Sequence, residues 1–191
     1  MNFNRKRKTT EMNEKLLNHT PIFDLVEKQD DGSIGFNPVG VNSNDWITII
    51  VERQGKWLME TQLRYGIMKK CLEFPSGIVE AGEDFAAAAS RELSEETGIY
   101  VEPSALTYLG QFAANPAFMS NRMRYFYVNL DKVSHVVGET KFDQHEKIES
   151  AWMNKEDAIR ERIENAEKEV ETNVSVFFAG AMELMRLKGI L

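Results

Sequence analysis

Seven short segments of the chain carry hydrophobic residues in alternation with polar ones or in continuous blocks, and these patterns predict β-strands. Their ranges are 20–26, 46–52, 57–64, 70–74, 106–112, 122–130 and 148–153. The segment 46–52 (WITIIVE) is rich in β-branched residues, which favour strands, and a short turn at Gln54 and Gly55 joins it to the next strand. The segment 1–20 is polar, and we expect it to be helical or loose. The segment 30–44 is rich in Gly, Asn, Asp and Ser, so we expect turns there.

Three longer segments predict helices, at 84–97, 156–170 and 174–188. Gly98 is expected to end the first helix as a left-handed cap. The last helix has hydrophobic residues at helical spacing, typical of a face that packs on a core. Strands followed by a helix, more strands and terminal helices predict an α/β fold (an α+β sandwich), in which a mixed β-sheet lies between α-helices.

Composition and charge narrow the class of protein. The 191 residues, 42% of them hydrophobic and 28% charged, suit one soluble domain with a small appendage. A net charge of −7 provides no overall field for nucleic acid, and we expect no nucleic-acid partner. Because the sequence has no apolar run of membrane-spanning length and no signal-peptide pattern after the basic residues 5–8, we expect a cytoplasmic protein without a membrane partner. The single cysteine, Cys71, excludes an intrachain disulfide.

The predicted helix 84–97 carries three carboxylates on one face. Glu92, Glu95 and Glu96 fall within about 100° of arc, since an α-helix turns by 100° per residue. Like charges at this spacing weaken a helix, and bound cations would offset that cost. Carboxylate oxygens favour Mg²⁺ or Mn²⁺ over zinc. The alternative interpretation is a solvated acidic helix face.

The residues around these carboxylates favour the metal interpretation. Ala88 and Ala89 have small side chains that let another backbone segment come close, and the Gly-containing loop 75–82 is the expected neighbour. A carbonyl of that loop could then join the carboxylates as a ligand. Arg91, four residues before Glu95, is placed to orient it.

The segment 77–99, GIVEAGEDFAAAASRELSEETGI, matches the Nudix box G-x5-E-x7-R-E-U-x-E-E-x-G-U, where U is apolar, at every fixed position. The chain therefore resembles the Nudix hydrolase superfamily. Outside the box, Gln62-Leu63-Arg64, Glu73-Phe74-Pro75-Ser76-Gly77 and Asn115-Pro116-Ala117 resemble the branch that contains ADP-ribose and nucleoside-diphosphate-sugar pyrophosphatases. The resemblance implies the Nudix fold with an N-terminal strand extension, and a divalent cofactor, Mg²⁺ or Mn²⁺.

The resemblance also implies roles for single residues. Glu92 and Glu96 match the principal metal ligands, and Glu92 is expected to act in catalysis as well. Glu95 is either a further ligand or a neighbour of the ligands. The backbone carbonyl of Ser76 matches the ligand from the loop. Glu83 is expected to stabilise the loop and the start of the helix.

Three further residues are predicted to act on the substrate. Arg64 is the candidate for binding phosphate oxygens, with an ordinary surface arginine as the alternative. Glu73 is expected to contact a substrate hydroxyl or to pair with an arginine. Glu146 is preferred to Asp143 as the carboxylate that activates the attacking water, and His145 is a third alternative.

The loop after the box is expected to shape substrate choice. Pro116 would hold it rigid, Phe118 and Met119 would cover a sugar or base, and Ser120 and Asn121 would contact hydroxyls. The alternative is a plain turn between two strands.

The predicted activity is metal-dependent hydrolysis of the diphosphate bond of ADP-ribose or a related nucleoside diphosphate sugar, a small-molecule substrate, to a nucleoside monophosphate and a sugar phosphate. The alternatives are a Nudix hydrolase of nucleoside triphosphates or dinucleoside polyphosphates, and a non-catalytic nucleotide-binding regulator. We expect two parts, an N-terminal extension at 1–43 and the Nudix hydrolase domain with its C-terminal helices at 44–191. We also expect a homodimer, because N-terminal strands in this branch often help to build one.

Overall fold

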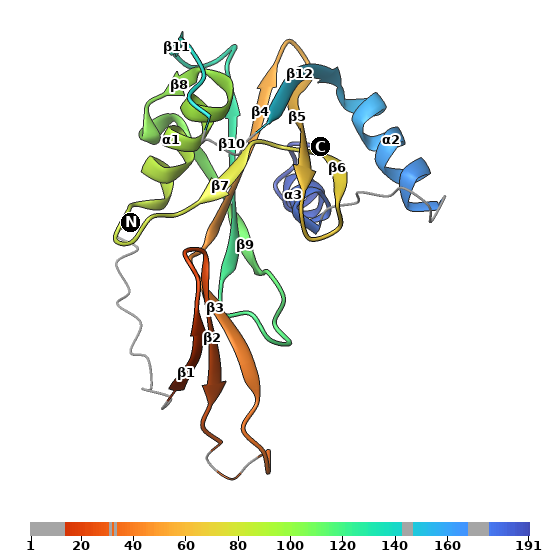
Figure 1. The fold of residues 1–191 in the computed structure, drawn as a ribbon. Helices are drawn as coiled ribbons and strands as arrows, with labels where there is room; N and C mark the ends of the chain where they lie inside the picture. The colour runs from red at the N-terminus through yellow and green to blue at the C-terminus, as the bar shows by residue number, and fades with distance from the viewer. Residues whose placement is uncertain (1–13, 31, 33, 143–146, 168–175) are drawn as a thin grey trace.

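The computed structural model describes residues 14–30, 32, 34–142, 147–167 and 176–191. Its centre is a seven-stranded mixed sheet with helix α1 (Phe85–Thr97) on one face and helices α2 (Lys155–Glu167) and α3 (Val176–Leu187) on the other (Figure 1). The strands of this sheet are β4 (Trp46–Arg53), β5 (Lys56–Arg64), β6 (Lys69–Glu73), β7 (Ser76–Ile78), β9 (Thr107–Ala113), β10 (Arg122–Asn129) and β12 (Ile148–Asn154). The predicted α/β sandwich is thereby confirmed.

Strands β4 and β5 separate soon after their hairpin, and this split positions the site. They pair only at Glu52 with Trp57 and Arg53 with Lys56. Beyond that point β6 pairs with β5, and β7 pairs with the first half of β4. The short strand β7 therefore fills the gap between the two strands and lies beside α1, with which it is in contact.

The strand alternation of β4 divides the interior into two cores. Ile47, Ile49 and Val51 point toward α1, whereas Ile50 points toward α2 and α3. All four side chains are fully buried, because the central strand of a sheet covered on both faces has no solvent side. This explains why 46–52 reads as an almost continuous hydrophobic run.

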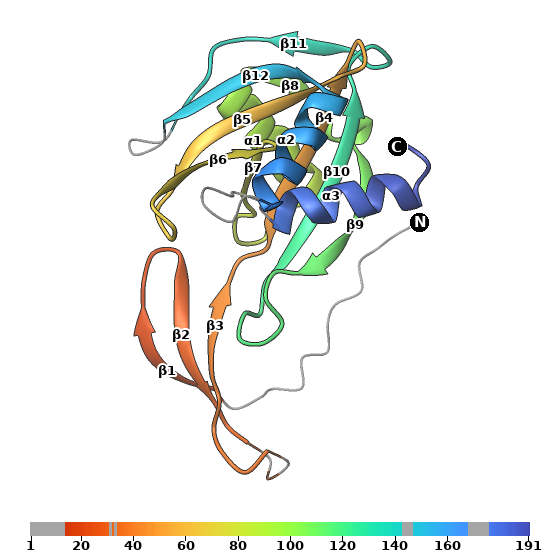
Figure 2. The same ribbon diagram turned by 90° about the vertical axis from the view of Figure 1, so that its right-hand side faces the viewer.

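The N-terminal segment forms a separate three-stranded sheet of β1 (Glu14–His19), β2 (Phe23–Lys28) and β3 (Val39–Ser43) that extends away from the body (Figure 2). The expectation of a helical or loose segment up to residue 20 is wrong for 14–19. The expected strand 20–26 begins with a turn instead, in which the Thr20 hydroxyl accepts hydrogen bonds from the backbone N–H groups of Ile22 and Phe23. Strand β3 lies where only turns were expected.

Strand β3 joins this sheet to the body. The N–H of Val41 donates to the carbonyl of Phe118 at 2.7 Å, and the N–H of Ser120 donates to the carbonyl of Val41 at 2.9 Å. The loop between β9 and β10 is thus held by β3, which makes it more than a plain turn between two strands.

The other predicted elements agree with the structure to within one or two residues at their ends. For the last two helices this applies to 155–167 and 176–187, since 168–175 lie outside the described residues. Two further short strands, β8 (Ile99–Val101) and β11 (His135–Val137), pair with each other, and a turn of 3-10 helix spans Pro103–Ala105. In the described part of the chain, no helix is long and apolar enough to span a membrane.

Candidate functional site

Helix α1 begins and ends at residues that the sequence marks as caps. The Asp84 carboxylate accepts hydrogen bonds from the N–H groups of Ala86 and Ala87, which have no partner within the helix. Gly98 has a φ of 72°, the left-handed conformation that favours glycine. A β-carbon at Gly98 would also lie 2.4 Å from the carbonyl oxygen of Gly138, so two constraints require glycine there.

Two of the three predicted carboxylates dock on the backbone of β7. Glu96 Oε2 accepts a hydrogen bond from the N–H of Ser76 at 3.0 Å, and Glu92 Oε1 accepts one from the N–H of Ile78 at 3.1 Å. Glu96 is buried and Glu92 is largely covered, whereas the side chain of Glu95 is 41% exposed. The structure therefore brings Glu92 and Glu96 together along one strand edge.

The pairing of β7 with β4 determines which backbone groups face α1. Val79 N–H bonds to the Asp45 carbonyl and Ile49 N–H bonds to the Pro75 carbonyl, so odd-numbered residues of this segment face β4. In an antiparallel pair the N–H and C=O of one residue point to the same edge, and successive residues alternate. The carbonyl of Ser76 therefore faces α1 together with the N–H that binds Glu96.

Gly77 lies between these two residues and leaves room for the carboxylate of Glu92. A β-carbon at Gly77 would be 2.0 Å from Cδ of Glu92 and within 2.3 Å of both its oxygens. No side chain fits there while Glu92 stays docked. The first glycine of the motif is thus explained by close approach of the helix to the strand.

Arg91 uses all five of its N–H groups to stabilise this arrangement. Nε and Nη2 donate to the two oxygens of Glu83, and Nη2 also donates to the Ile78 carbonyl. Nη1 donates to Glu92 at 2.9 Å and to Glu95 at 3.0 Å.

Hydrogen bonds from Arg91 lower the pKa of Glu83, and the pKa of Arg91 is raised in turn, mainly by Glu83. Glu83 stabilises the loop as predicted, because it also accepts the N–H of Glu80.

The donor set fits a hard divalent cation. Glu83, Glu92 and Glu95 share the single guanidinium of Arg91, so negative charge is in excess around Arg91, and the Glu96 carboxylate binds the backbone of Ser76. Every candidate ligand is an oxygen, as Mg²⁺ and Mn²⁺ prefer. Within the described residues, three or more His, Cys, Asp or Glu side chains do not converge at metal-binding distances. The fit therefore rests on the chemistry of the donors and on their common strand edge.

Arg64 and Glu73 form an ion pair next to these carboxylates. Arg64 Nη2 lies 2.5 Å and Nε 2.9 Å from Glu73 Oε2, and Nη2 also donates to the Ser76 hydroxyl at 3.3 Å. The side chain of Glu73 is 4% exposed and that of Arg64 is 37% exposed. Of the two roles expected for Glu73, pairing with an arginine is thus present in the structure.

The remaining predicted site residues are the candidate bases and those of the loop between β9 and β10. The candidate bases Asp143, His145 and Glu146 lie outside the described residues. Phe118 is 48% exposed and Asn121 is only 1% exposed, and contact of Asn121 with substrate hydroxyls stays a prediction.

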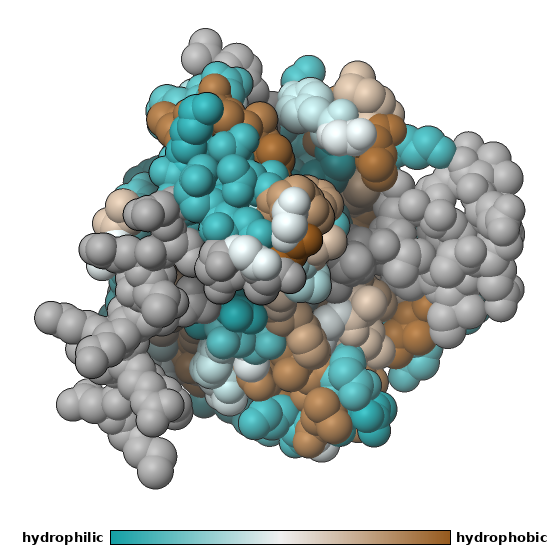
Figure 3. All heavy atoms as spheres, turned by 90° about the horizontal axis from the view of Figure 1, so that it is seen from below, coloured by the Kyte–Doolittle hydropathy of each residue, from teal (hydrophilic) through white to brown (hydrophobic). Residues whose placement is uncertain are grey.

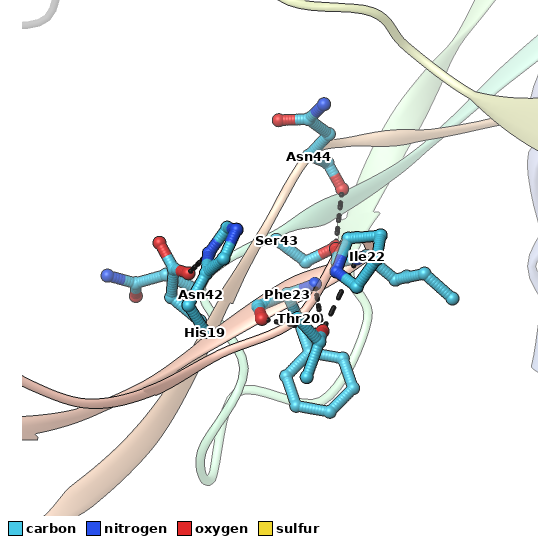
Figure 4. A pocket seen from close by; sticks show the side chains of 9 residues that line it. His19, Thr20, Ile22, Phe23, Asn42, Ser43 and Asn44 are labelled. Atoms are coloured by element: carbon cyan, nitrogen blue, oxygen red, sulfur yellow. Dashed lines mark hydrogen bonds and ion pairs between the residues drawn. The ribbon is translucent and has the colours of Figure 1, made fainter.

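Two hollows lie beside the elements described so far. One, of about 280 Å³, is formed by the β1–β2 turn and the end of β3 and contains the exposed pair His19–Asp24 (Figure 4). The other, of about 500 Å³, lies between the loop 79–85 and the pair Asn44 and Asp45. Asp45 there contacts Arg124, a contact that sequence reasoning missed because the two residues are 79 positions apart.

The comparisons with known proteins identify the class. A family model of the NUDIX domain matches residues 44–174, and the chain therefore belongs to this family. This confirms the resemblance drawn from the box and supports pyrophosphohydrolase activity. Nudix hydrolases generally use divalent metal ions.

Three individual proteins that are similar to this chain differ in their sequence identity to it and in the share of each chain that is covered. The methanol dehydrogenase activator of Bacillus methanolicus is 28% identical over 142 residues, covering 73% of this chain and 74% of that protein. The ADP-ribose pyrophosphatase of Bacillus subtilis (strain 168) is 30% identical over 112 residues, and the match covers 59% of this chain and 58% of that enzyme. A crystal structure of an ADP compounds hydrolase superimposes with a TM-score of 0.67 over 94% of this chain and 95% of its own, at 19% identity, which shows a shared fold.

Proposed function

We propose that this protein is a divalent-metal-dependent hydrolase that cleaves the diphosphate bond of ADP-ribose or a related nucleoside diphosphate sugar. The products would be a nucleoside monophosphate and a sugar phosphate. The observation that supports this most is the docking of Glu92 and Glu96 on the edge of β7 that also presents the carbonyl of Ser76. The substrate class is supported by the residues outside the box and by the relatives named ADP-ribose pyrophosphatase.

Three or four residues would hold the metal. We propose Glu92, Glu96 and the carbonyl of Ser76 as ligands, with Glu95 as a further ligand or a neighbour that Arg91 orients. When bound, such ions neutralise charge on the diphosphate and lower the pKa of a bound water. Mg²⁺ is proposed as the physiological ion, with Mn²⁺ as its substitute.

The chain's own groups would bind the substrate and accept the proton. Arg64 is proposed to bind diphosphate oxygens through its exposed part, while Glu73 holds the other part in place. A water oxygen forms a bond to one phosphorus in line with the bridging oxygen, whose bond to that phosphorus breaks. Glu146 is proposed to take the proton of the water, a role that rests on the family resemblance alone.

The N-terminal extension at 1–43 is proposed to join two copies of the chain. In the described part of this extension several large hydrophobic residues are more than half exposed, namely Leu16 on β1 and, in the connections between the strands, Ile22, Ile34 and Phe36. The space-filling view from below shows hydrophobic patches among hydrophilic ones (Figure 3). Exposed apolar patches on a sheet without covering helices are typical of an interaction surface. A second copy is the partner that this chain always has available.

The proposed function is tested by a phosphate-release screen with and without Mg²⁺ across ADP-ribose, nucleoside diphosphate sugars, dinucleoside polyphosphates and nucleoside triphosphates. We expect no turnover with chelator, recovery with Mg²⁺, and the highest kcat/KM on ADP-ribose or a nucleoside diphosphate sugar. Glu96→Gln should lower kcat by about two to three orders of magnitude through loss of a charged ligand. Its amide oxygen can still accept the Ser76 N–H, so thermal unfolding should change little.

Glu156→Gln serves as the control, because Glu156 is exposed on α2 and should leave kcat unchanged. Activity of Glu96→Gln close to that of the unaltered protein would refute the site. A tenfold preference for triphosphates or dinucleoside polyphosphates would refute the substrate class alone. Failure to hydrolyse any of these compounds would favour the alternative that the protein is a non-catalytic nucleotide-binding regulator.

A further inference from the structure

Asp45 connects the end of β7 to strand β10. Its backbone carbonyl accepts the N–H of Val79 at 2.9 Å. Its carboxylate accepts the N–H of Arg122 at 2.7 Å and is held by Arg124 through Nε at 2.8 Å and Nη2 at 2.6 Å. The start of the loop 79–84 is therefore fastened to β10 through one aspartate.

Arg124 also holds the end of the same loop. Its guanidinium carbon lies 3.6 Å from the centroid of the Phe85 ring, and Phe85 is the first residue of α1. The side chain of Arg124 is 15% exposed and Phe85 is 36% exposed, so this cation–π contact is partly shielded from water, which strengthens it. Both ends of the loop thus converge on the ion pair of Asp45 and Arg124.

We infer that Asp45, Arg124 and Phe85 form a clamp that sets the position of α1 against β7 and thereby the spacing of the metal-binding groups. This inference rests on the proposed function, and the three residues are positioning residues that do not touch the substrate. The hollow of about 500 Å³ separates much of the loop from Asn44 and Asp45, so the clamp bridges a region that is not filled by packing.

The geometry of a helix explains why a contact at Phe85 matters for distant carboxylates. Glu92 and Glu96 lie about 10 Å and about 16 Å further along the helix axis, at a rise of 1.5 Å per residue. Arg91 ties the middle of the helix to Glu83 of the loop and to Ile78 of β7, and Gly98 meets Gly138 at the end of the helix. If the first turn is released, α1 can tilt about these remaining contacts, which moves the carboxylates relative to Ser76.

Two substitutions at one position separate the cation–π contact from ordinary packing. Phe85→Leu keeps an apolar side chain but removes the ring, whereas Phe85→Tyr keeps the ring. The control is Arg53→Ala, which removes another cation–π contact, with Trp152 at 4.9 Å, away from the loop. The measurements are the dissociation constant of Mn²⁺ by calorimetry and the hydrogen exchange of the Ser76 and Ile78 amides without metal.

For Phe85→Leu we expect the Mn²⁺ dissociation constant and the exchange rates of both amides to rise about three- to tenfold, the factor that one partly exposed cation–π contact supplies. Phe85→Tyr and Arg53→Ala should stay near the unaltered protein. Unchanged exchange in Phe85→Leu, or equal effects of Leu and Tyr, would overturn the clamp. If the unaltered protein binds no Mn²⁺, the proposed function fails, and the exchange rates still decide the clamp by the same criteria.

Discussion

At the scale of single residues, the burial of Glu73 affects how a substitution of Arg64 must be interpreted. Removing Arg64 leaves a buried carboxylate without its ion-pair partner, which costs stability whether or not Arg64 binds substrate. Loss of stability alone therefore does not separate a structural arginine from a phosphate-binding one. Neutralising Glu73 in the same variant removes that penalty.

We predict that Arg64→Ala lowers the free energy of unfolding by about 1–3 kcal/mol and raises KM for the diphosphate substrate. In the double variant Arg64→Ala/Glu73→Gln, the free energy of unfolding should recover while the raised KM persists, because the guanidinium group proposed to bind phosphate is still missing. Denaturant unfolding and steady-state kinetics on the four proteins of this cycle provide the measurement. Recovery of KM together with stability would mean that Arg64 acts only through Glu73.

Much of the candidate site could be predicted at the residue scale, because its side chains lie close together in sequence. Glu92 and Glu96 share a helix face by spacing alone, and Arg91 reaches Glu95 as expected. Asp45 and Arg124 could not be predicted, because they meet only after β4 and β10 pair in parallel, and no local pattern records that register.

At the scale of elements, the site is the contact between α1 and β7. The strand supplies backbone groups that alternate between two edges, and the helix supplies side chains one turn apart. The contact is close only because Gly77 has no side chain and because Ala88 and Ala89 are fully buried in the core beneath the helix. A change in this spacing should affect every proposed metal-binding group at once.

We predict that Gly77→Ala lowers kcat by about a hundredfold, since misplacement by about 1 Å can have an effect of that size. The added methyl group would displace the carboxylate of Glu92 or the strand, and overpacking should lower the free energy of unfolding by about 1–3 kcal/mol. Gly66→Ala is the matched control, because a β-carbon there meets nothing within 4 Å. Equal kinetics in both variants would contradict the close contact of α1 with β7.

The predictability of each element depended on its length and on its hydrophobic pattern. Strands β4 and β10 have eight residues each, and their side chains face two cores, so their patterns were unmistakable. Strands β7, β8 and β11 have three residues each, too few to show alternation. Strand β1 is exposed throughout, so its sequence carries no burial pattern and resembles a loose polar segment.

At the scale of the whole molecule, the N-terminal sheet contrasts with the body. The body buries two cores on opposite faces of one sheet, and one face is covered by α1 and the other by α2 and α3. In the described residues, no helix covers the sheet of β1, β2 and β3 (Figure 2). A small sheet is stable when one hydrophobic face packs against something else. The register places Phe23, Leu25, Val39 and Val41 on one face, which a second copy could cover.

We predict that the protein is a dimer in solution through this face. Phe23 and Val39 are 39% and 50% exposed, so replacing both with aspartate should leave each protomer folded while the charges prevent association. Light scattering coupled to size exclusion should give twice the protomer mass for the unaltered protein and the protomer mass for Phe23→Asp/Val39→Asp. Val136→Asp, on exposed strand β11, is the control and should keep the dimer mass. A monomeric unaltered protein, or a double variant that stays dimeric, would show that the N-terminal sheet does not form the interface.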